Sequence, residues 1–333
     1  MDEHALFNLY HIKIETVLSK TKFAAGGYHF HIVPAANHSE EEIHERMHMA
    51  NHLHSKGELG ILIPLQNQHG KFLSNYRGSQ IVLLGVATSM PSEVGAESGI
   101  GLQLATFHYR GRYLNNRIDS LSRIGQWKDL WERRIDQIEK FWQGKCVTHP
   151  QNEFERMFIE YFPYYLGLGE NAIQYLVDTE KDDYPGESDI ATICHDRFCQ
   201  DCFGVEFGKN PFDWVYDHPS RDLAEWSREQ YNNLPNTYHY EMQKFFQDYF
   251  RVLLPSNFTL RLLYARLLLP INFLETVETY FTSQSENIRH TLEDKLHDDI
   301  KKTSYYEKFL KEFFELVGIP KQQLPFRVPE WLI

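Results

Sequence analysis

The pattern of apolar residues changes near Gly85, and this change limits the folds that the chain can adopt. Before it, short runs alternate polar with aromatic or β-branched residues, as in Tyr28–Val33 and Gln80–Leu84, and each run predicts a β-strand. One helix is predicted in this part, from the start signal Asn37-His38-Ser39 to Ser55. After Gly85 long amphipathic helices dominate. The order predicts an α+β fold with a small β-rich N-terminal part and a larger helical part.

Further elements follow from the same patterns. Strands are predicted at Tyr10–Ile14 and Gly60–Pro64, with a turn at Gly26-Gly27. The predicted helices after Gly85 are Gly99–His108, Trp127–Trp142, Phe154–Phe162, Ala172–Asp178, Tyr240–Val252 and Leu260–Leu269, with a strand and hairpin between Thr192 and Tyr216. Pro163 and Gly167 are expected to interrupt the helical pattern. The apolar tail, residues 324–331, is expected to be extended and to pack on the body of the protein.

Length, charge and composition narrow the functional classes. The chain has 333 residues, enough for one large core or two unequal lobes, and its apolar fraction of 42% is ordinary for a folded protein. A formal net charge of −12 repels phosphate polyanions, so nucleic acid is not expected as a partner. The start lacks the pattern of a signal peptide, and the most apolar window, Leu260–Leu274, contains Arg261, Arg266 and Pro270. We therefore expect no membrane span, and the four cysteines are expected to be reduced thiols made in a cytosol.

A motif in the C-terminal half carries the strongest functional signal. It consists of Ile193-Cys194-His195-Asp196-Arg197-Phe198, then Asp213-Trp214-Val215-Tyr216-Asp217, then Arg221-Asp222-Leu223-Ala224. This order resembles the catalytic loop, the metal-binding strand and the next helix of the aminoglycoside phosphotransferase and choline kinase superfamily. Within it, the chain is most similar to the kinase-like spore coat proteins of the CotS and YutH type. The resemblance runs from about residue 20 to the C-terminus.

The resemblance implies a fold and a division of the chain. The fold is bilobal and protein-kinase-like, of the aminoglycoside phosphotransferase type. Residues 1–85 are expected to form the β-rich N-terminal lobe with one helix, and residues 86–333 the helical C-terminal lobe with the catalytic loop. A hinge is expected near Leu84–Val86.

The resemblance also implies a role for each position of the catalytic loop. His195 matches the leading histidine, and Asp196 stands where glycine is usual. Arg197 replaces the catalytic aspartate. Cys199 and Cys202 replace a second histidine and the asparagine that helps to hold magnesium. The loop thus has the outline of a catalytic loop with altered side chains.

These replacements bear on the reaction. Phosphoryl transfer needs a carboxylate that accepts the proton of the attacking hydroxyl. Arg197 puts a cation at that place, and Asp196 lies one residue away, where a side chain points in a different direction. We therefore predict a pseudokinase that needs no cofactor. The alternative is an active, ATP-dependent small-molecule phosphotransferase that binds Mg-ATP and uses Asp196 and Asp213 in altered roles.

Two acids after the loop have competing interpretations. The resemblance makes Asp213 the magnesium-binding aspartate, and so a candidate metal and cofactor ligand. A turn carboxylate that accepts hydrogen bonds from neighbouring amides would give the same pattern. Asp222 is expected to cap a helix that begins at Leu223.

The phosphate-binding residues of a kinase are weakly represented. Kinases place a lysine on the third strand and pair it with a glutamate on the next helix. Here no lysine lies between Lys22 and Lys56, and His31 is the nearest match, with Glu41 or Glu45 as its helix partner. Histidine is short and mostly neutral at pH 7, so it replaces a fixed cation poorly. His31 is therefore a candidate ATP contact, or a strand residue that is packed or exposed.

Two groups of residues have features of metal sites. His44, His48 and His52 share one face of the predicted helix, but the sequence identifies no fourth ligand, and a solvated face has the same spacing. Cys194, His195, Cys199 and Cys202 are close in sequence, yet their spacing matches no standard zinc motif. Neither pattern favours a metal site.

The resemblance finally implies a setting. It predicts a protein of the spore coat that acts by binding or assembly during sporulation, with other coat proteins as partners. It also predicts synthesis in the cytoplasm of the mother cell before assembly into the coat. A small-molecule substrate is expected only if the protein is active.

Overall fold

The computed structural model describes residues 2–88, 99–203, 208–233, 237–320 and 324. The chain forms two compact units. The first contains Met1–Arg123, Ile190–Trp226 and Asp248–Leu253, and the second contains Ile124–Asp189, Ser227–Gln247 and Leu254–Ile333. The division into lobes at residues 1–85 and 86–333 stays a prediction.

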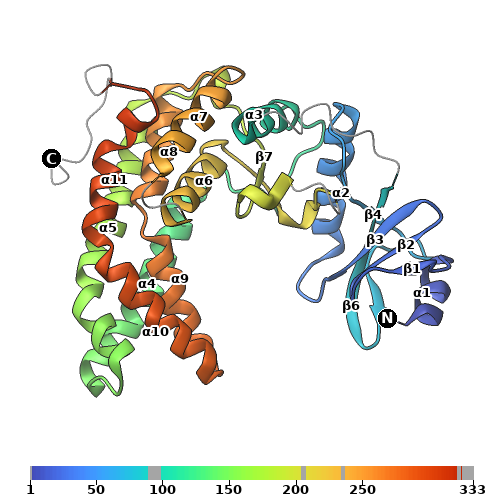
Figure 1. Ribbon diagram of the computed structural model, residues 1–333, viewed down its shortest axis with the longest axis horizontal. Helices are drawn as coiled ribbons and strands as arrows, with labels where there is room; N and C mark the ends of the chain where they lie inside the picture. The colour runs from blue at the N-terminus through green and yellow to red at the C-terminus, as the bar shows by residue number, and fades with distance from the viewer. Residues whose placement is uncertain (1, 89–98, 204–207, 234–236, 321–323, 325–333) are drawn as a thin grey trace. The chain divides into compact units, whose positions relative to one another are not determined.

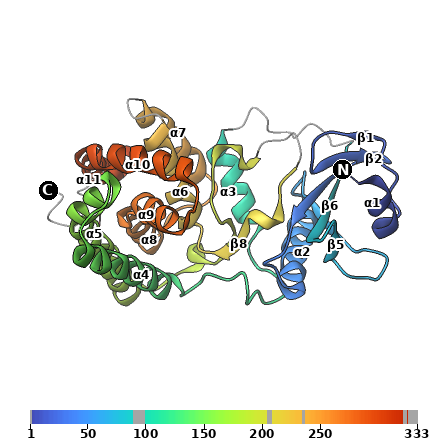
Figure 2. The same ribbon diagram turned by 90° about the horizontal axis from the view of Figure 1, so that it is seen from below.

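The first unit is built on an antiparallel sheet. Its elements are α1 (Glu3–Tyr10), β1 (Thr16–Val17), β2 (Lys22–Ala25), β3 (Tyr28–Pro34), α2 (Glu40–Ser55), β4 (Ile63–Leu65), β5 (Ser74–Tyr76) and β6 (Ser79–Ala87). The strand order is β1-β2-β3-β6-β4, and β5 pairs with β6. Helices α1 and α2 lie on opposite sides of this sheet (Figure 2).

Each face of the sheet has its own apolar core, because side chains alternate along a strand. On the α1 side, Phe23 stacks on Phe30 beside Leu6. On the α2 side, Leu84 of β6 packs with Ile43 of α2. The sheet is therefore covered on both faces.

Several predicted elements of the first unit are confirmed. Helix α2 follows an N-cap at Ser39 and ends at Ser55, and β3 contains the predicted Tyr28–Val33. Gly26 and Gly27 form the turn between β2 and β3, with φ values of 55° and 77° that favour glycine. The strand predicted at Gln80–Leu84 is part of β6, which continues through Gly85 to Ala87.

The strand predicted at Tyr10–Ile14 is wrong. Tyr10 is the last residue of α1, which Asp2 caps and Leu6 anchors against the sheet, and residues 11–14 form neither helix nor strand. His11 ends the helix with a φ of 56°. The strand predicted at Gly60–Pro64 is shorter and later, since β4 begins at Ile63.

The rest of the first unit surrounds a small two-stranded sheet. It contains α3 (Ile100–Arg110), β7 (Thr192–His195), the short 3-10 helices Gln200–Phe203 and Pro211–Asp213, β8 (Trp214–Asp217) and the start of α6 (Ser220–Asn233). β7 and β8 are antiparallel, with His195 opposite Trp214. Gly111, just after α3, approaches β7 so closely that a Cβ there would lie 2.6 Å from Thr192 Oγ1.

The second unit is helical. It contains α4 (Trp127–Thr148), α5 (Glu153–Asp182), most of α7 (Tyr238–Phe250), α8 (Asn257–Leu268), α9 (Ile271–Thr282), α10 (Glu286–Lys301) and α11 (Thr303–Leu316). Helix α8 lies in the interior of this unit, because every residue from Thr259 to Leu268 is buried. Figure 2 shows α8 and α9 enclosed by α4, α5, α10 and α6.

The predicted interruption at Pro163 and Gly167 is wrong, because α5 is continuous from Glu153 to Asp182. Proline has no N–H, so the carbonyl of Ile159 loses its helical partner at residue 163. The indole N–H of Trp142 on α4 donates to that carbonyl at 3.0 Å. The neighbouring helix therefore replaces the missing hydrogen bond.

The window Leu260–Leu274 covers parts of α8 and α9, and its two arginines are buried. Arg261 pairs with Asp182 and Asp183 at the end of α5. Among the described residues, no helix is both long and apolar enough to cross a membrane, as predicted. The predicted tail lies outside the described residues, apart from Leu324.

Candidate functional site

The loop that follows β7, residues 196–203, is held at its start by Asp222. His195 ends β7, and its backbone N–H lies 3.0 Å from each carboxylate oxygen of Asp222. The ring Nδ1 of His195 lies 2.8 Å from Oδ2 of the same carboxylate. Asp222 does not cap a helix at Leu223 as predicted. Helix α6 begins earlier, at Ser220, and the carboxylate of Asp222 accepts the backbone N–H of His195 on β7.

A second histidine contacts the same carboxylate. His108 Nε2 lies 3.1 Å from Asp222 Oδ2, and His108 Nδ1 lies 2.7 Å from the Tyr249 hydroxyl. Burial lowers the pKa of His108 and outweighs the opposite effect of Asp222, so the ring is neutral. A carboxylate only accepts, so Nε2 carries the proton, and the Tyr249 hydroxyl donates to Nδ1.

The charge of Asp222 is stable in this environment. Burial alone would raise its pKa, but the electrostatic effect of His195 and the hydrogen bonds from His108 and His195 outweigh burial. They lower the pKa of Asp222 to about 2. The carboxylate is therefore ionised and fully hydrogen-bonded at neutral pH.

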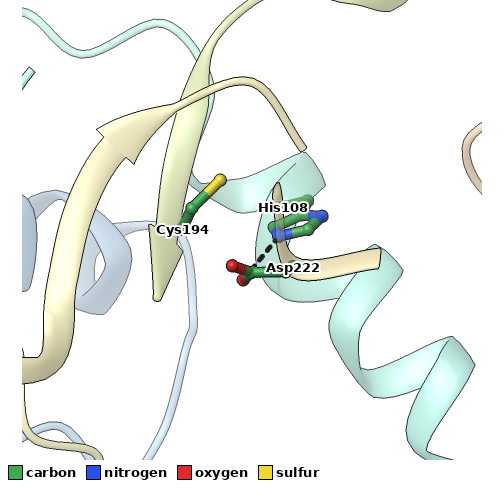
Figure 3. Close-up of side chains that lie close together, drawn as sticks. All are labelled: His108, Cys194 and Asp222. Carbon is green, nitrogen blue, oxygen red and sulfur yellow. Dashed lines mark hydrogen bonds and ion pairs between the residues drawn. The ribbon is translucent and has the colours of Figure 1, made fainter. Parts of the chain in front are cut away.

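Cys194 lies beside this pair, as Figure 3 shows. One ligand atom each from His108, Cys194 and Asp222 lie within 4.8 Å of one another, and all three residues are buried. The thiol of Cys194 donates to the backbone carbonyls of Asp217 and His218, at 3.6 and 3.5 Å. Each of the three side chains therefore has a hydrogen-bond partner within the protein, so a metal ion is not needed to account for the cluster.

The metal-like patterns of the sequence are not brought together. The group around Asp222 contains Cys194 but neither Cys199 nor Cys202. The three histidines of α2 have separate partners: the Phe72 ring for His44, Asn116 for His48, and the carbonyls of Arg110 and Arg112 for His52.

Arg197 and Asp196 are both held by α6. The guanidinium of Arg197 lies 2.8 Å from the carboxylate of Glu225, which is 8% exposed. The carboxylate of Asp196 lies 2.8 Å from the guanidinium of Arg221, which also binds Asp217 at 3.0 Å. Arg197, at the place expected for the catalytic aspartate, is thus paired with an acid, and the adjacent Asp196 is paired with a cation.

Asp213 lies next to this loop. Its backbone carbonyl accepts the N–H of Asp196 at 2.7 Å, and its side chain is exposed. Desolvation by the surrounding protein raises the pKa of Asp213, while His195 and Arg46 partly oppose that rise. Asp213 is therefore placed beside the loop, and its role as a metal or cofactor ligand stays a prediction.

His31 and Glu45 do not form a kinase-like pair. His31 on β3 lies opposite Lys22 on β2, and burial, then the charges of Lys22 and His29, lower its pKa to about 4. The carboxylate of Glu45 turns away and accepts the backbone N–H groups of residues 119, 120 and 121 at 2.9, 3.0 and 2.9 Å. The ring of His31 is therefore neutral at pH 7, and Glu45 supports a loop.

Several residues of this region were not predicted. Arg46 of α2 is buried and donates to the carbonyls of Pro211 and Trp214 at 2.7 and 3.2 Å, over the ring of Phe212. The sequence contains one indication that Arg46 is buried. It lies three residues after Ile43 and three before Met49, on the apolar face of α2. No comparable signal points to Glu225.

Solved structures share this fold. An aminoglycoside phosphotransferase from Alicyclobacillus acidocaldarius is similar with a TM-score of 0.69 and 12% identity, over 96% of this chain and 96% of that chain. A spectinomycin phosphotransferase, solved with ADP and spectinomycin, has a TM-score of 0.51 and 13% identity, over 89% of this chain and 92% of that chain. The predicted α+β, protein-kinase-like fold is thereby confirmed.

Sequence comparisons are more specific. The "Endospore coat-associated protein YutH" of Bacillus subtilis (strain 168) is 39% identical over 311 residues, which are 93% of this chain and 91% of that protein. The family model described as "Spore coat putative kinase YutH" matches residues 3–313. The predicted resemblance is thus confirmed, and the chain belongs to the YutH family of kinase-like spore coat proteins.

Proposed function

We propose that this protein is a spore coat-associated pseudokinase that acts by binding or assembly during sporulation. The ion pair between Arg197 and Glu225 carries the proposal. A general base must accept a proton, whereas a guanidinium stays protonated at any physiological pH. Because Glu225 holds Arg197 in the loop, the cation occupies a fixed position there.

The neighbouring carboxylate does not compensate for this cation. Asp196 is paired with Arg221 at 2.8 Å. Asp196 is 63% exposed, so water weakens this ion pair. The pair nevertheless directs the carboxylate toward the start of α6.

The side chains fit Mg-ATP poorly. His31 is neutral where a phosphate-binding cation is expected, and Glu45 is used to hold residues 119–121. Cys202, a soft ligand, replaces the asparagine oxygen that would suit magnesium. We therefore propose no cofactor and derive no step through a nucleotide.

The coat assignment rests on the relative from Bacillus subtilis, whose name states that it is associated with the endospore coat. We propose the same location for this protein, with synthesis in the mother-cell cytoplasm and other coat proteins as partners. The first test is a fluorescent fusion followed through sporulation, with Asp196→Ala and Asp213→Asn variants beside the wild type. All three should gather around the forming spore. A diffuse signal from the wild-type fusion would remove the coat assignment. If the wild type gathers around the spore and both variants fail to do so, a catalytic activity is favoured.

A second test addresses the nucleotide directly. The melting temperature of the purified protein should not change with millimolar Mg-ATP, whereas a ligand at a hundred times its dissociation constant adds about 2.7 kcal/mol of stability. Asp213→Asn is the matched control. A shift that disappears in this variant would contradict the pseudokinase proposal.

The alternative is an active small-molecule phosphotransferase. The exposed carboxylate of Asp213 beside Asp196 favours it, because two acids there could bind a cation. ATP-dependent phosphorylation of an amine- or hydroxyl-bearing compound, abolished by Asp213→Asn, would establish it.

A further inference from the structure

The two thiols of Cys199 and Cys202 lie together in the loop that follows β7. Their sulfur atoms are 3.2 Å apart, and both residues are partly buried. The backbone N–H of Cys199 lies 3.1 Å from the sulfur of Cys202. The neighbouring sulfurs occupy positions where the superfamily pattern has a histidine and an asparagine.

The backbone of this segment suits a bridge. The N–H of Cys202 donates to the carbonyl of Cys199 at 3.0 Å, which closes a turn of four residues. Such turns keep their end Cα atoms within about 7 Å. Disulfides span Cα separations of about 4.4–6.8 Å and need sulfurs about 2.05 Å apart. The two sulfur atoms, now 3.2 Å apart, therefore need to approach by about 1 Å to form the bridge.

We propose that Cys199 and Cys202 form an intramolecular disulfide when the protein meets a low-molecular-weight disulfide oxidant. The thiolate of Cys199 attacks one sulfur of the oxidant, forms a mixed disulfide and releases one reduced thiol. The sulfur of Cys202 then attacks Cys199 Sγ, forms the bridge and releases the second thiol. Two protein thiols are thus oxidised, and one disulfide is reduced to two thiols.

The order of the two attacks follows from the surroundings of Cys202. Burial raises the pKa of the Cys202 thiol well above its usual range and outweighs the opposite effect of the hydrogen bond from the backbone N–H of Cys199. Its thiol also points toward the carbonyl of Arg197, at 3.5 Å. Cys199 is therefore the first nucleophile and Cys202 the resolving thiol.

The bridge has a structural consequence. The bridge joins Cys202 to Cys199, and Cys199 lies two residues after Arg197. It therefore restrains residues 199–202, next to the Arg197–Glu225 ion pair. A bridged pair also offers no thiolate to a metal ion, so oxidation removes both thiols of this loop as metal ligands.

The other two cysteines provide internal controls. Cys146 is exposed on α4, in the second unit, and Cys194 is a buried residue of β7 itself. An exposed thiol without a neighbour takes up one molecule of glutathione and keeps it. A paired thiol loses the glutathione again when the bridge closes.

The experiment treats the reduced full-length protein with oxidised glutathione and follows intact mass, free thiols and the peptide map under denaturing conditions. Cys146→Ser should lose two hydrogen atoms, whereas the wild type should lose the same two and also carry one glutathione on Cys146. Both proteins should yield a peptide bridged between Cys199 and Cys202. Cys202→Ser should instead retain glutathione on Cys199. Cys199→Ser should form no bridge and leave Cys202 largely unmodified. The proposal would be overturned if the wild type carried glutathione on both thiols without a bridge, or if Cys199→Ser lost the same two hydrogens.

Discussion

The carboxylate of Asp222 accepts hydrogen bonds from both the backbone N–H and the ring of His195. It therefore fixes the last residue of β7 and the direction in which the following loop leaves the strand. His108 supports the same carboxylate from α3. The position of the loop thus depends on one buried negative charge.

The stability of the protein should depend on the protonation of Asp222. Its pKa is about 2, below its ordinary value of 3.8, so the ionised form stabilises the fold at pH values above about 4. That contribution, about 2 kcal/mol, is lost as the pH falls from about 4 toward 2. Urea unfolding of the wild type and Asp222→Asn at pH 7 and at pH 3 measures it. The difference between the two proteins should shrink at low pH, and a constant difference would contradict this.

The same network gives a graded prediction at pH 7. Asp222→Asn should lower the free energy of unfolding by about 3 kcal/mol, because it removes a buried charged acceptor of hydrogen bonds from His195 and His108 and turns one acceptor into a donor. Tyr249→Phe should cost only about 1 kcal/mol, since it removes one hydrogen bond to His108. Equal effects of the two variants would show that the charge is unimportant.

The hydrogen bond from the Trp142 indole should stabilise the protein because Pro163 cannot donate to the Ile159 carbonyl. Trp142→Phe leaves the Ile159 carbonyl without its donor and should destabilise the protein by about 1–3 kcal/mol. Pro163→Ala restores a backbone N–H at residue 163, so it should rescue much of that loss in the double variant. Denaturant unfolding of the four proteins forms the cycle. Strict additivity would exclude the proposed hydrogen-bond exchange.

Asp299 should destabilise the protein at neutral pH. Burial raises its pKa to about 6, and Oδ2 has no hydrogen-bond partner among the described residues. A raised acid pKa means that the folded state binds the extra proton between about pH 4 and 6, so stability falls as the pH rises through this window. Asp299→Asn should therefore raise stability by about 1–2 kcal/mol at pH 7.5 and have little effect at pH 4. The exposed Asp294 on the same helix is the control, and Asp294→Asn should change the free energy of unfolding little.

Glu45 should protect a loop rather than a nucleotide. Glu45→Ala should speed hydrogen exchange at the amides of residues 119–121, because their three N–H groups lose one shared acceptor. Glu41→Ala, at an exposed position on the same helix, should leave those amides unchanged. Unchanged exchange in Glu45→Ala would contradict this role.

The elements with strong local signals could be predicted from the sequence. The N-cap at Ser39 and the glycine at residue 57 bound α2, and the alternation of Tyr28–Val33 gives β3, because these signals depend on neighbouring residues alone. Helix α1 could not be predicted, because an eight-residue helix that buries only Leu6 gives little periodicity. The continuity of α5 depends on Trp142, which lies on another helix.

The candidate site shows the same division. The order of the motif located His195, Asp196, Arg197 and Asp213 on and beside one loop. Their partners on α6 could not be predicted, because an ion pair such as Arg197–Glu225 depends on how a strand and a helix meet. The roles assigned to His31 and Glu45 rested on position in a pattern, and side-chain direction decides such roles.

Two adjacent residues of α2 are tied to different stretches of chain. Glu45 holds the backbone of residues 119–121, and Arg46 holds the carbonyls of Pro211 and Trp214. A helix secured on two sides in this way cannot swing independently between an engaged and a released position. Any partner that contacts α2 therefore meets a preformed surface, and its binding should be governed by fit rather than by the cost of rearranging the helix.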